Sequence, residues 1–171
     1  MLIGCLLASI DEGEEAPPQQ VVETEKIKYL TDYELSQLYS CKVDIRRKDG
    51  SIIEVTYEEA IMLMKIAVAE AGDDLLGQFY IMAVIINRLH DPNFPDSIKD
   101  IIYQDKQFSP IKDGRFDKAE PTLNSHLALC ELEKGLMKCE AMYFESESVE
   151  DSWQSKNREL LFVYNGQRYY K

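Results

Sequence analysis

The sequence lacks the features that define several large classes of protein. It contains 19 lysines and arginines against 31 aspartates and glutamates, which gives a formal net charge of −12. A nucleic-acid-binding protein needs basic side chains to neutralise phosphates, so this charge argues against a nucleic-acid partner. No stretch approaches the ~20 apolar residues of a membrane-spanning helix. We therefore expect neither nucleic acid as a partner nor a membrane span.

Metal-binding patterns are also missing. His90 and His126 are the only histidines, and none of the four cysteines lies in a C-x-x-C pair or beside a histidine. Zinc sites built from cysteine and histidine have such spacings, so we expect no metal, and the sequence suggests no other cofactor. A disulfide between Cys130 and Cys139 requires the chain to fold back after Gly135. The alternative is two unlinked thiols.

Length and composition suit one compact domain with some additional tail. The chain has 171 residues, of which 45% are hydrophobic. Residues 1–28 are rich in acidic residues, which predicts a flexible N-terminal linker. Residues 29–55 predict a short helix and a hairpin with Asp49-Gly50 at its turn, as an extension of the main domain. The main domain is expected at residues 56–171.

The segment Leu2-Ile3-Gly4-Cys5 resembles a bacterial lipobox, in which the cysteine carries a lipid. A lipobox follows a charged and apolar leader, and here only Met1 precedes the segment. Cys5 is therefore a candidate lipid anchor, and a chance match is the alternative.

The main domain is expected to begin with two helices. Thr56 and Glu59 form a capping box ahead of an apolar run. This pattern predicts a helix that continues to Glu70 and ends at Gly72.

The second predicted helix begins after Asp73 or Asp74, which are expected to cap it, and runs to about Leu89. Its middle is apolar all round, which predicts a buried central helix. Gly77 in this helix either allows a neighbouring backbone to approach closely or simply lowers the helix propensity by ~1 kcal/mol.

Shorter elements follow. Asp96 is expected to cap a short helix, and residues 105–120 are expected to form a long polar loop of the kind that often carries function. Pro121 suits the first position of another helix, which is expected to end near Gly135.

The C-terminal part predicts strands instead of helices. Residues 141–144 are expected to form one strand. Residues 160–170 are expected to form a hairpin with Asn165-Gly166 in a type I′ turn. Helices followed by strands predict an α+β domain.

Glu70 is the candidate catalytic residue. It ends an apolar helix segment, where desolvation and the partial negative charge of the helix C-terminus both disfavour an ionised carboxylate. A carboxyl group that keeps its proton near neutral pH can protonate the oxygen of a glycosidic bond. The alternative is a solvated glutamate at a helix end.

The order and spacing of a set of short motifs lead to a family resemblance. The motifs are Glu70-Ala71, Gly77-Gln78, Asn87-Arg88, Phe94-Pro95, Ile101-Ile102, Tyr103-Gln104, Gln107-Phe108-Ser109-Pro110, Asp113-Gly114-Arg115, Ala141 to Phe144 and Tyr164 to Tyr170. With them, roughly the last two thirds of the chain resemble the SleB-type cell-wall hydrolases, whose best-known members are spore cortex-lytic enzymes. The resemblance implies a mainly helical, lysozyme-like α+β domain with a small C-terminal β-sheet, and it gives Glu70 the role of catalytic acid.

The resemblance also implies a reaction. The expected substrate is peptidoglycan, cut between N-acetylmuramic acid and N-acetylglucosamine by lytic transglycosylation, which leaves a 1,6-anhydromuramic product. A hydrolytic muramidase of the same fold and a non-catalytic wall-binding module are the alternatives. We expect an exported monomer of the cell envelope or the extracellular space, with a spore or phage association left open.

Four further residues are candidate substrate contacts. Gln107 and Ser109 offer hydrogen bonds to acetamido or hydroxyl groups, and Phe108 and Tyr143 offer rings that stack on sugars. Each also has a structural alternative, as a loop-pinning amide, a capping hydroxyl or a core aromatic residue. Asn87 is expected to tie helix ends to the polar loop that follows.

Two positions depart from the family pattern. Glu145-Ser146 stands where members usually have Asn-Pro, and Gln167 stands where many have histidine. Glu145 is a conceivable second carboxylate, with a surface charge at a strand end as the alternative. Trp153, the only tryptophan, either faces sugar or lies in the core.

Overall fold

The computed structural model describes residues 42–46, 52–135 and 137–171. The predicted linker of residues 1–28, with Cys5, and the helix predicted between Tyr29 and Tyr39 lie outside the described residues. Within the described ranges, none of the helices has the length and apolar composition needed to cross a membrane.

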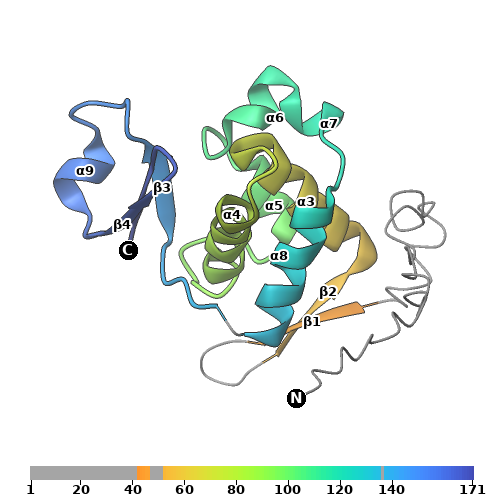
Figure 1. The fold of residues 1–171 in the computed structure, drawn as a ribbon. Coiled ribbons are helices and arrows are strands. Elements are labelled where there is room, and N and C mark those ends of the chain that lie inside the picture. Colours follow the sequence, from red (N-terminus) through yellow and green to blue (C-terminus); the bar gives the residue numbers. More distant parts are fainter. Residues whose placement is uncertain (1–41, 47–51, 136) are drawn as a thin grey trace, which may run out of the picture. The chain divides into compact units, whose positions relative to one another are not determined.

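Three helices form the centre of the described fold (Figure 1). They are α3 (Tyr57–Ala71), α4 (Leu75–Arg88) and α8 (Leu123–Lys134). Helix α4 packs against both of the others, and its apolar run at residues 83–86 is buried. The prediction of a buried central helix is therefore confirmed.

Both ends of α3 form as the sequence predicts. The Thr56 hydroxyl accepts a hydrogen bond from the Glu59 N–H at 3.3 Å, and the Glu59 carboxylate accepts one from the Thr56 N–H at 3.0 Å. This reciprocal pair is the predicted capping box. Gly72 ends the helix with a φ of 63°, a backbone conformation that favours glycine.

Two helices begin later than predicted, one by a single residue and the other by two. Ser97, rather than Asp96, caps α5 (Ile98–Tyr103), because the Ser97 hydroxyl accepts the backbone N–H three residues further on. Likewise, Thr122 caps α8, and Pro121 lies outside the helix. In both cases a hydroxyl group further along the chain satisfies the free N–H groups of the first turn.

The segment predicted as a polar loop, residues 105–120, contains two short helices. They are α6 (Ser109–Asp113) and α7 (Arg115–Lys118). Gly114 joins them with a φ of 77°, and Phe116 is buried. Helices of four and five residues are too short to show a hydrophobic period, which explains why the sequence pattern missed them.

The C-terminal segment folds into an antiparallel sheet with the strand order β3-β5-β4. Its elements are β3 (Tyr143–Ser146), α9 (Trp153–Asn157), β4 (Leu160–Tyr164) and β5 (Gln167–Tyr170). The first strand begins two residues later than predicted, and α9 was not expected. Asn165 and Gly166 have φ values of 44° and 73°, as a type I′ turn requires. The α+β fold class is confirmed.

An aromatic cluster joins this sheet to the helices. The ring centroid of Tyr80 in α4 lies 4.7 Å from that of Phe162, 5.4 Å from that of Tyr164 and 5.3 Å from that of Tyr169. Such pairs stabilise a contact beyond the area that they bury. The cluster therefore holds the β4–β5 hairpin against α4.

The N-terminal hairpin shares the helical core. Strands β1 (Lys42–Arg46) and β2 (Ile52–Thr56) pair antiparallel, as predicted, although the turn itself lies outside the described residues. Ile45 and Val55 are buried in the same cluster as the side chains of α3, α4 and α8. The hairpin is thus packed into the fold that it was expected to extend.

Candidate functional site

Glu70 lies in the last turn of α3, half-buried. Burial raises the pKa of its carboxyl group from 4.5 to about 7, and the negative charge of Asp113 adds to this effect. The nearby guanidinium of Arg115 and a hydrogen bond from the Ser109 N–H act in the opposite direction, because they favour the carboxylate. The opposing influences leave a group that both holds and releases a proton near neutral pH.

Arg115 fixes the surroundings of Glu70. Its Nη1 donates to the carbonyl oxygen of Ala69 at 2.7 Å, and its Nη2 donates to the Ser109 hydroxyl at 2.8 Å. Its Nε forms an ion pair with Asp113 at 2.9 Å. One side chain thus ties α6 and α7 to the end of α3 and brings a positive charge close to the carboxyl group.

The junction between α3 and α4 is held by two residues of the Gly-Gln motif. The buried Gln78 donates a hydrogen bond from its amide nitrogen to the carbonyl oxygen of Gly72. Gly77 lets the two helices approach closely, since a Cβ atom at this position would come within 3.0 Å of the Ala71 Cβ. These contacts fix the backbone that carries Glu70.

Asp74 connects the start of α4 to the C-terminal hairpin. It occupies the N-cap position, but its side chain makes no capping hydrogen bond. Instead, its carboxylate accepts the Tyr164 hydroxyl at 3.0 Å and the Asn165 amide at 3.1 Å. The predicted capping role is therefore replaced by a link between α4 and the turn of the β4–β5 hairpin.

A cavity of about 70 Å³ lies beside Glu70. Its lining consists of Glu70, Ala71, Gly77, Ile81, Tyr164, Asn165, Gln167 and Tyr169. Burial raises the pKa of the Tyr169 hydroxyl, and the charge of Glu70 contributes in the same direction. The ends of α3 and α4 and the β4–β5 hairpin therefore all line the cavity beside the carboxyl group.

Of the four predicted substrate contacts, only Ser109 lies against Glu70 through a hydrogen bond. Its backbone N–H supports the carboxylate, and the adjacent Gln107 is half-buried. Phe108 is 3% exposed and packs on Phe144, with ring centroids 5.8 Å apart. The structure therefore favours core packing, not sugar stacking, for Phe108.

Tyr143 also has packing partners in the structure. The guanidinium carbon of Arg158 lies 3.2 Å from its ring centroid and covers one face, while that of Arg88 lies at 5.4 Å. Trp153, by contrast, is 64% exposed, so it is not a core residue, and the Arg158 guanidinium lies 5.0 Å from its ring.

Glu145 is tied into its own part of the fold. Its carboxylate accepts the Tyr170 hydroxyl at 2.6 Å and the Ser152 hydroxyl at 2.8 Å, and it pairs with Arg168 at 3.6 Å. These contacts join β3, β5 and the start of α9. Glu145 is neither a free surface charge nor a lining residue of the cavity beside Glu70.

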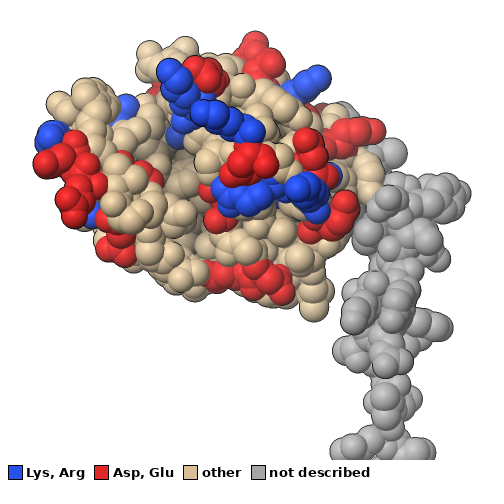
Figure 2. Space-filling view, turned by 90° about the horizontal axis from the view of Figure 1, so that it is seen from above, with Lys and Arg blue, Asp and Glu red and all other residues tan. Residues whose placement is uncertain are grey.

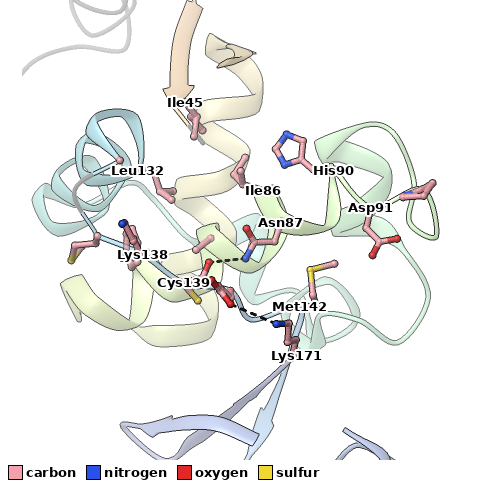
Figure 3. Close-up of a pocket in the computed structure, with 16 residues that line it drawn as sticks. Ile45, Ile86, Asn87, His90, Asp91, Leu132, Lys138, Cys139, Met142 and Lys171 are labelled. Carbon is pink, nitrogen blue, oxygen red and sulfur yellow. Dashed lines mark hydrogen bonds and ion pairs between the residues drawn. The ribbon is translucent and has the colours of Figure 1, made fainter. Parts of the chain in front are cut away.

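A larger cavity, of about 620 Å³, lies toward the other end of α4 and does not include Glu70 (Figure 3). Asn87 borders it and donates to the carbonyl oxygens of Cys139 at 3.0 Å and Ala141 at 2.9 Å. The expected link from Asn87 to residues 105–120 is therefore wrong, and the residue ties α4 to the segment before β3. Cys130 and Cys139 are free thiols.

Figure 2 shows the face of the molecule seen from the side of α6 and α7. Its surface is hollowed between the part over α9 and the C-terminal sheet and the part over the helices. Charged side chains of both signs stand around this hollow.

The sequence pattern singled out Glu70 and Ser109 as candidates, but not the contacts that surround Glu70. The links from Arg115 to Ala69 and from Asp74 to Tyr164 span 46 and 90 positions of the chain. The only sequence signal for Arg115 and Asp74 was that they lie within or beside the family motifs.

Comparisons with known proteins agree with this fold. A model of the Cell Wall Hydrolase family matches residues 72–170, and the chain belongs to that family. Its fold is that of SleB catalytic domains, as the two structures reported next show. The family match begins two residues after Glu70.

The relatives include one curated protein and two solved structures. Over 44 residues the chain is 39% identical to the spore cortex-lytic enzyme of Halalkalibacterium halodurans, a match covering 26% of this chain and only 13% of that relative. It resembles the catalytic domain of the Bacillus cereus SleB protein, with a TM-score of 0.58, 23% identity and coverage of 67% of this chain and 91% of that one.

The second structure is the catalytic domain of the germination-specific lytic transglycosylase SleB from Bacillus anthracis. The TM-score is 0.59, the identity is 21%, and the match covers 68% of this chain and 97% of that chain. At these identities the two structures establish a shared fold.

Proposed function

We propose that this protein cleaves the glycan strands of peptidoglycan, with Glu70 as its acid and base. Membership of the Cell Wall Hydrolase family and the SleB-type fold support a peptidoglycan-degrading enzyme. The observation that carries the proposal is the half-buried Glu70, whose pKa is raised to about 7. Ordinary glutamates are ionised at this pH and have no proton to give.

In the first step Glu70 donates its proton to the oxygen between N-acetylmuramic acid and N-acetylglucosamine. The bond from the muramic C1 to this oxygen breaks, and the N-acetylglucosamine side leaves with a hydroxyl group. Glu70 is now a carboxylate, which the Ser109 N–H and the charge of Arg115 stabilise.

In the second step the carboxylate takes the proton of the muramic C6 hydroxyl. The C6 oxygen bonds to C1 and closes a 1,6-anhydro ring, and Glu70 returns to its protonated state. No water is consumed, so a single group acts as acid and then as base. We therefore favour lytic transglycosylation over hydrolysis.

Three other carboxylates of the fold already have hydrogen-bond or ion-pair partners, which supports a mechanism with one catalytic carboxyl group. Hydrolysis with inversion or retention ordinarily uses a second carboxylate. Asp113 is paired with Arg115, Asp74 accepts two hydrogen bonds from the hairpin, and Glu145 accepts two from hydroxyl groups of its own region. Each of these three is held in another role.

The test is to digest purified peptidoglycan and weigh the fragments by mass spectrometry. We expect the wild-type protein to release fragments one water lighter than hydrolysis products. Glu70→Gln should lower the rate by about a hundredfold or more, because it removes the acid and base, whereas Glu133→Gln on the exposed face of α8 should not.

Undiminished cleavage by Glu70→Gln would contradict the proposal, and products carrying the added water would favour the muramidase alternative. Binding to peptidoglycan without cleavage by the wild type would favour a wall-binding module.

A further inference from the structure

Arg88 is buried at the end of α4, and no step of the proposed reaction uses it. Only 2% of the residue is exposed, and burial lowers the pKa of its guanidinium group to about 10. Its Nε donates to the carbonyl oxygen of Met142 at 2.7 Å, whereas its Nη1 is buried without a hydrogen-bond partner. Among the described residues, 42–46, 52–135 and 137–171, no carboxylate forms an ion pair with it. A buried charge without a counter-ion is costly, so other contacts must hold the guanidinium.

Three aromatic rings lie around the guanidinium group. Its carbon lies 5.1 Å from the ring centroid of Phe94, 5.6 Å from that of Phe108 and 5.4 Å from that of Tyr143. A guanidinium over an aromatic face is attracted to the ring, more strongly where water is excluded. The rings come from the loop after α4, the residue before α6 and strand β3. Arg88 therefore joins three separate segments to the end of α4.

Phe108 links this cluster to the catalytic group. It occupies the N-cap position of α6, where its side chain supplies no capping hydrogen bond. A helix of five residues is not stable by its own hydrogen bonds, so the start of α6 depends on how Phe108 packs. The next residue, Ser109, gives its backbone N–H to the Glu70 carboxylate. Arg115 binds the Ser109 hydroxyl, whereas the orientation of the N–H follows from the peptide plane that Ser109 shares with Phe108.

We propose that Arg88 is a positioning residue of the site: its guanidinium holds the Phe108 ring and thereby keeps the Ser109 N–H directed at the catalytic carboxyl group. The inference rests on the proposed function only in calling Glu70 catalytic, because the contacts themselves do not depend on the reaction. It gives Arg88 of the Asn87-Arg88 motif a role at the site.

Loss of the Arg88 guanidinium should raise the pKa of Glu70. The Ser109 N–H favours the carboxylate and so opposes the rise that burial causes. When this donor moves away, burial and the negative charge of Asp113 are opposed by Arg115 alone. The charge of Arg88 is not among the influences on Glu70, so its effect comes through position.

The other charged and titratable groups around Glu70 stay the same in this test. They are Asp74 at the start of α4, Asp113 of α6, Arg115 of α7, Tyr164 of β4 and Tyr169 of β5. Burial raises the pKa of both tyrosine hydroxyls, so near neutral pH they carry no charge. A change in the Glu70 titration therefore reports on the Ser109 donor.

The experiment is an NMR titration of the Glu70 carboxyl carbon in the wild type and in Arg88→Met. Methionine has a similar length and packs against aromatic rings, but it lacks the guanidinium plane and the Nε donor. We expect the midpoint to rise by about one pH unit, the effect of losing one hydrogen bond to a charged group. The alkaline limb of kcat/KM for peptidoglycan cleavage should move to higher pH with it, because cleavage begins from protonated Glu70.

The matched control is Arg158→Met. The Arg158 guanidinium also lies on Tyr143, 3.2 Å from the ring centroid, but its other ring contact is with Trp153 and not with Phe108. The same chemical change on the same tyrosine should therefore leave the midpoint at its wild-type value.

A second variant, Phe108→Leu, tests the other side of the contact and should raise the midpoint as Arg88→Met does. In the double variant the two shifts should not add, because both substitutions remove the same contact.

An unchanged midpoint in an Arg88→Met protein that thermal unfolding shows to be folded would overturn the positioning role. An equal rise in Arg158→Met would overturn it too, because general loosening would then explain both shifts. Where Arg88→Met does not fold, Phe108→Leu decides: a rise supports the contact, and an unchanged midpoint overturns it. Absence of cleavage by the wild type would contradict the proposed function, and the NMR comparison would still decide the inference.

Discussion

Glu70 lowers the stability of the fold whenever it is ionised. Its pKa is about 7 in the folded protein against 4.5 for a solvated glutamate, so the folded state binds this proton more tightly than the unfolded state does. Below pH 4.5 the group is protonated in both states and carries no penalty. As the pH rises from 4.5 through 7, the free energy of unfolding falls by about 3 kcal/mol relative to its value at low pH.

This linkage predicts that Glu70→Gln is stabilising at alkaline pH. A neutral amide carries no ionisation penalty, so relative to wild type the variant should gain about 3 kcal/mol between pH 4 and pH 8. Urea unfolding at the two pH values measures the difference. Glu133→Gln on the exposed face of α8 serves as the control and should show little change. A Glu70→Gln effect that is equal at both pH values would show that the carboxyl group is not desolvated.

Among individual residues, the sequence singled out Glu70 and Ser109 as candidates but did not show that the two residues contact each other. The apolar run before it and Gly72 after it are local signals of a water-poor helix end. The groups that oppose the pKa rise, Arg115 and Ser109, come from short helices about 40 positions away. Contacts at such separations depend on tertiary packing, which a local pattern does not contain.

Among the elements, the crossing of α3 and α4 matters most for the site. Gly77 lies in α4, and Ala71 ends α3 one residue after Glu70. A side chain at Gly77 would press directly against the Ala71 Cβ, so the packing of these helices and the position of the carboxyl group are coupled.

We predict that Gly77→Ala destabilises the protein and slows cleavage. In an unobstructed helix this change stabilises by about 1 kcal/mol, whereas here overpacking should reverse the sign. Chemical denaturation and cleavage rates measure both effects. The double variant Ala71→Gly, Gly77→Ala restores the space and should recover part of the rate. A more stable Gly77→Ala protein with full activity would contradict the close approach seen in the structure.

The elements that the sequence predicted well are those with strong local signals. The capping box of α3, the apolar α4 and the Asn165-Gly166 turn each combine a residue type with a fixed offset. Helices α6, α7 and α9 have four or five residues. A helix this short is held by tertiary contacts, such as those of Arg115, and not by its own periodicity.

For the molecule as far as the structure describes it, the central feature is the larger of two hydrophobic clusters, which includes the N-terminal hairpin. The alternation in β1 and β2 predicted a hairpin but did not say which surface covers its apolar face. The structure shows that the helices do: Ile45 and Val55 are 1% and 0% exposed within the helical cluster.

Removing the Ile45 side chain should therefore destabilise the whole domain. Ile45→Ala is expected to cost about 2–5 kcal/mol, the range for large apolar residues in a packed core. Ile52→Ala, at a 51% exposed position of β2, is the matched control and should stay within about 0.5 kcal/mol. Urea unfolding followed by circular dichroism measures both. A cost for Ile45→Ala as small as that for Ile52→Ala would show that the hairpin does not belong to the core.

The protonation of Glu70 near neutral pH is tested most directly by NMR titration of its side-chain carboxyl carbon, with the signal assigned by its absence in Glu70→Gln. The structure predicts a midpoint near pH 7, because burial outweighs the Arg115 charge and the Ser109 hydrogen bond. A midpoint near pH 4.5, the value of a solvated glutamate, would contradict the account.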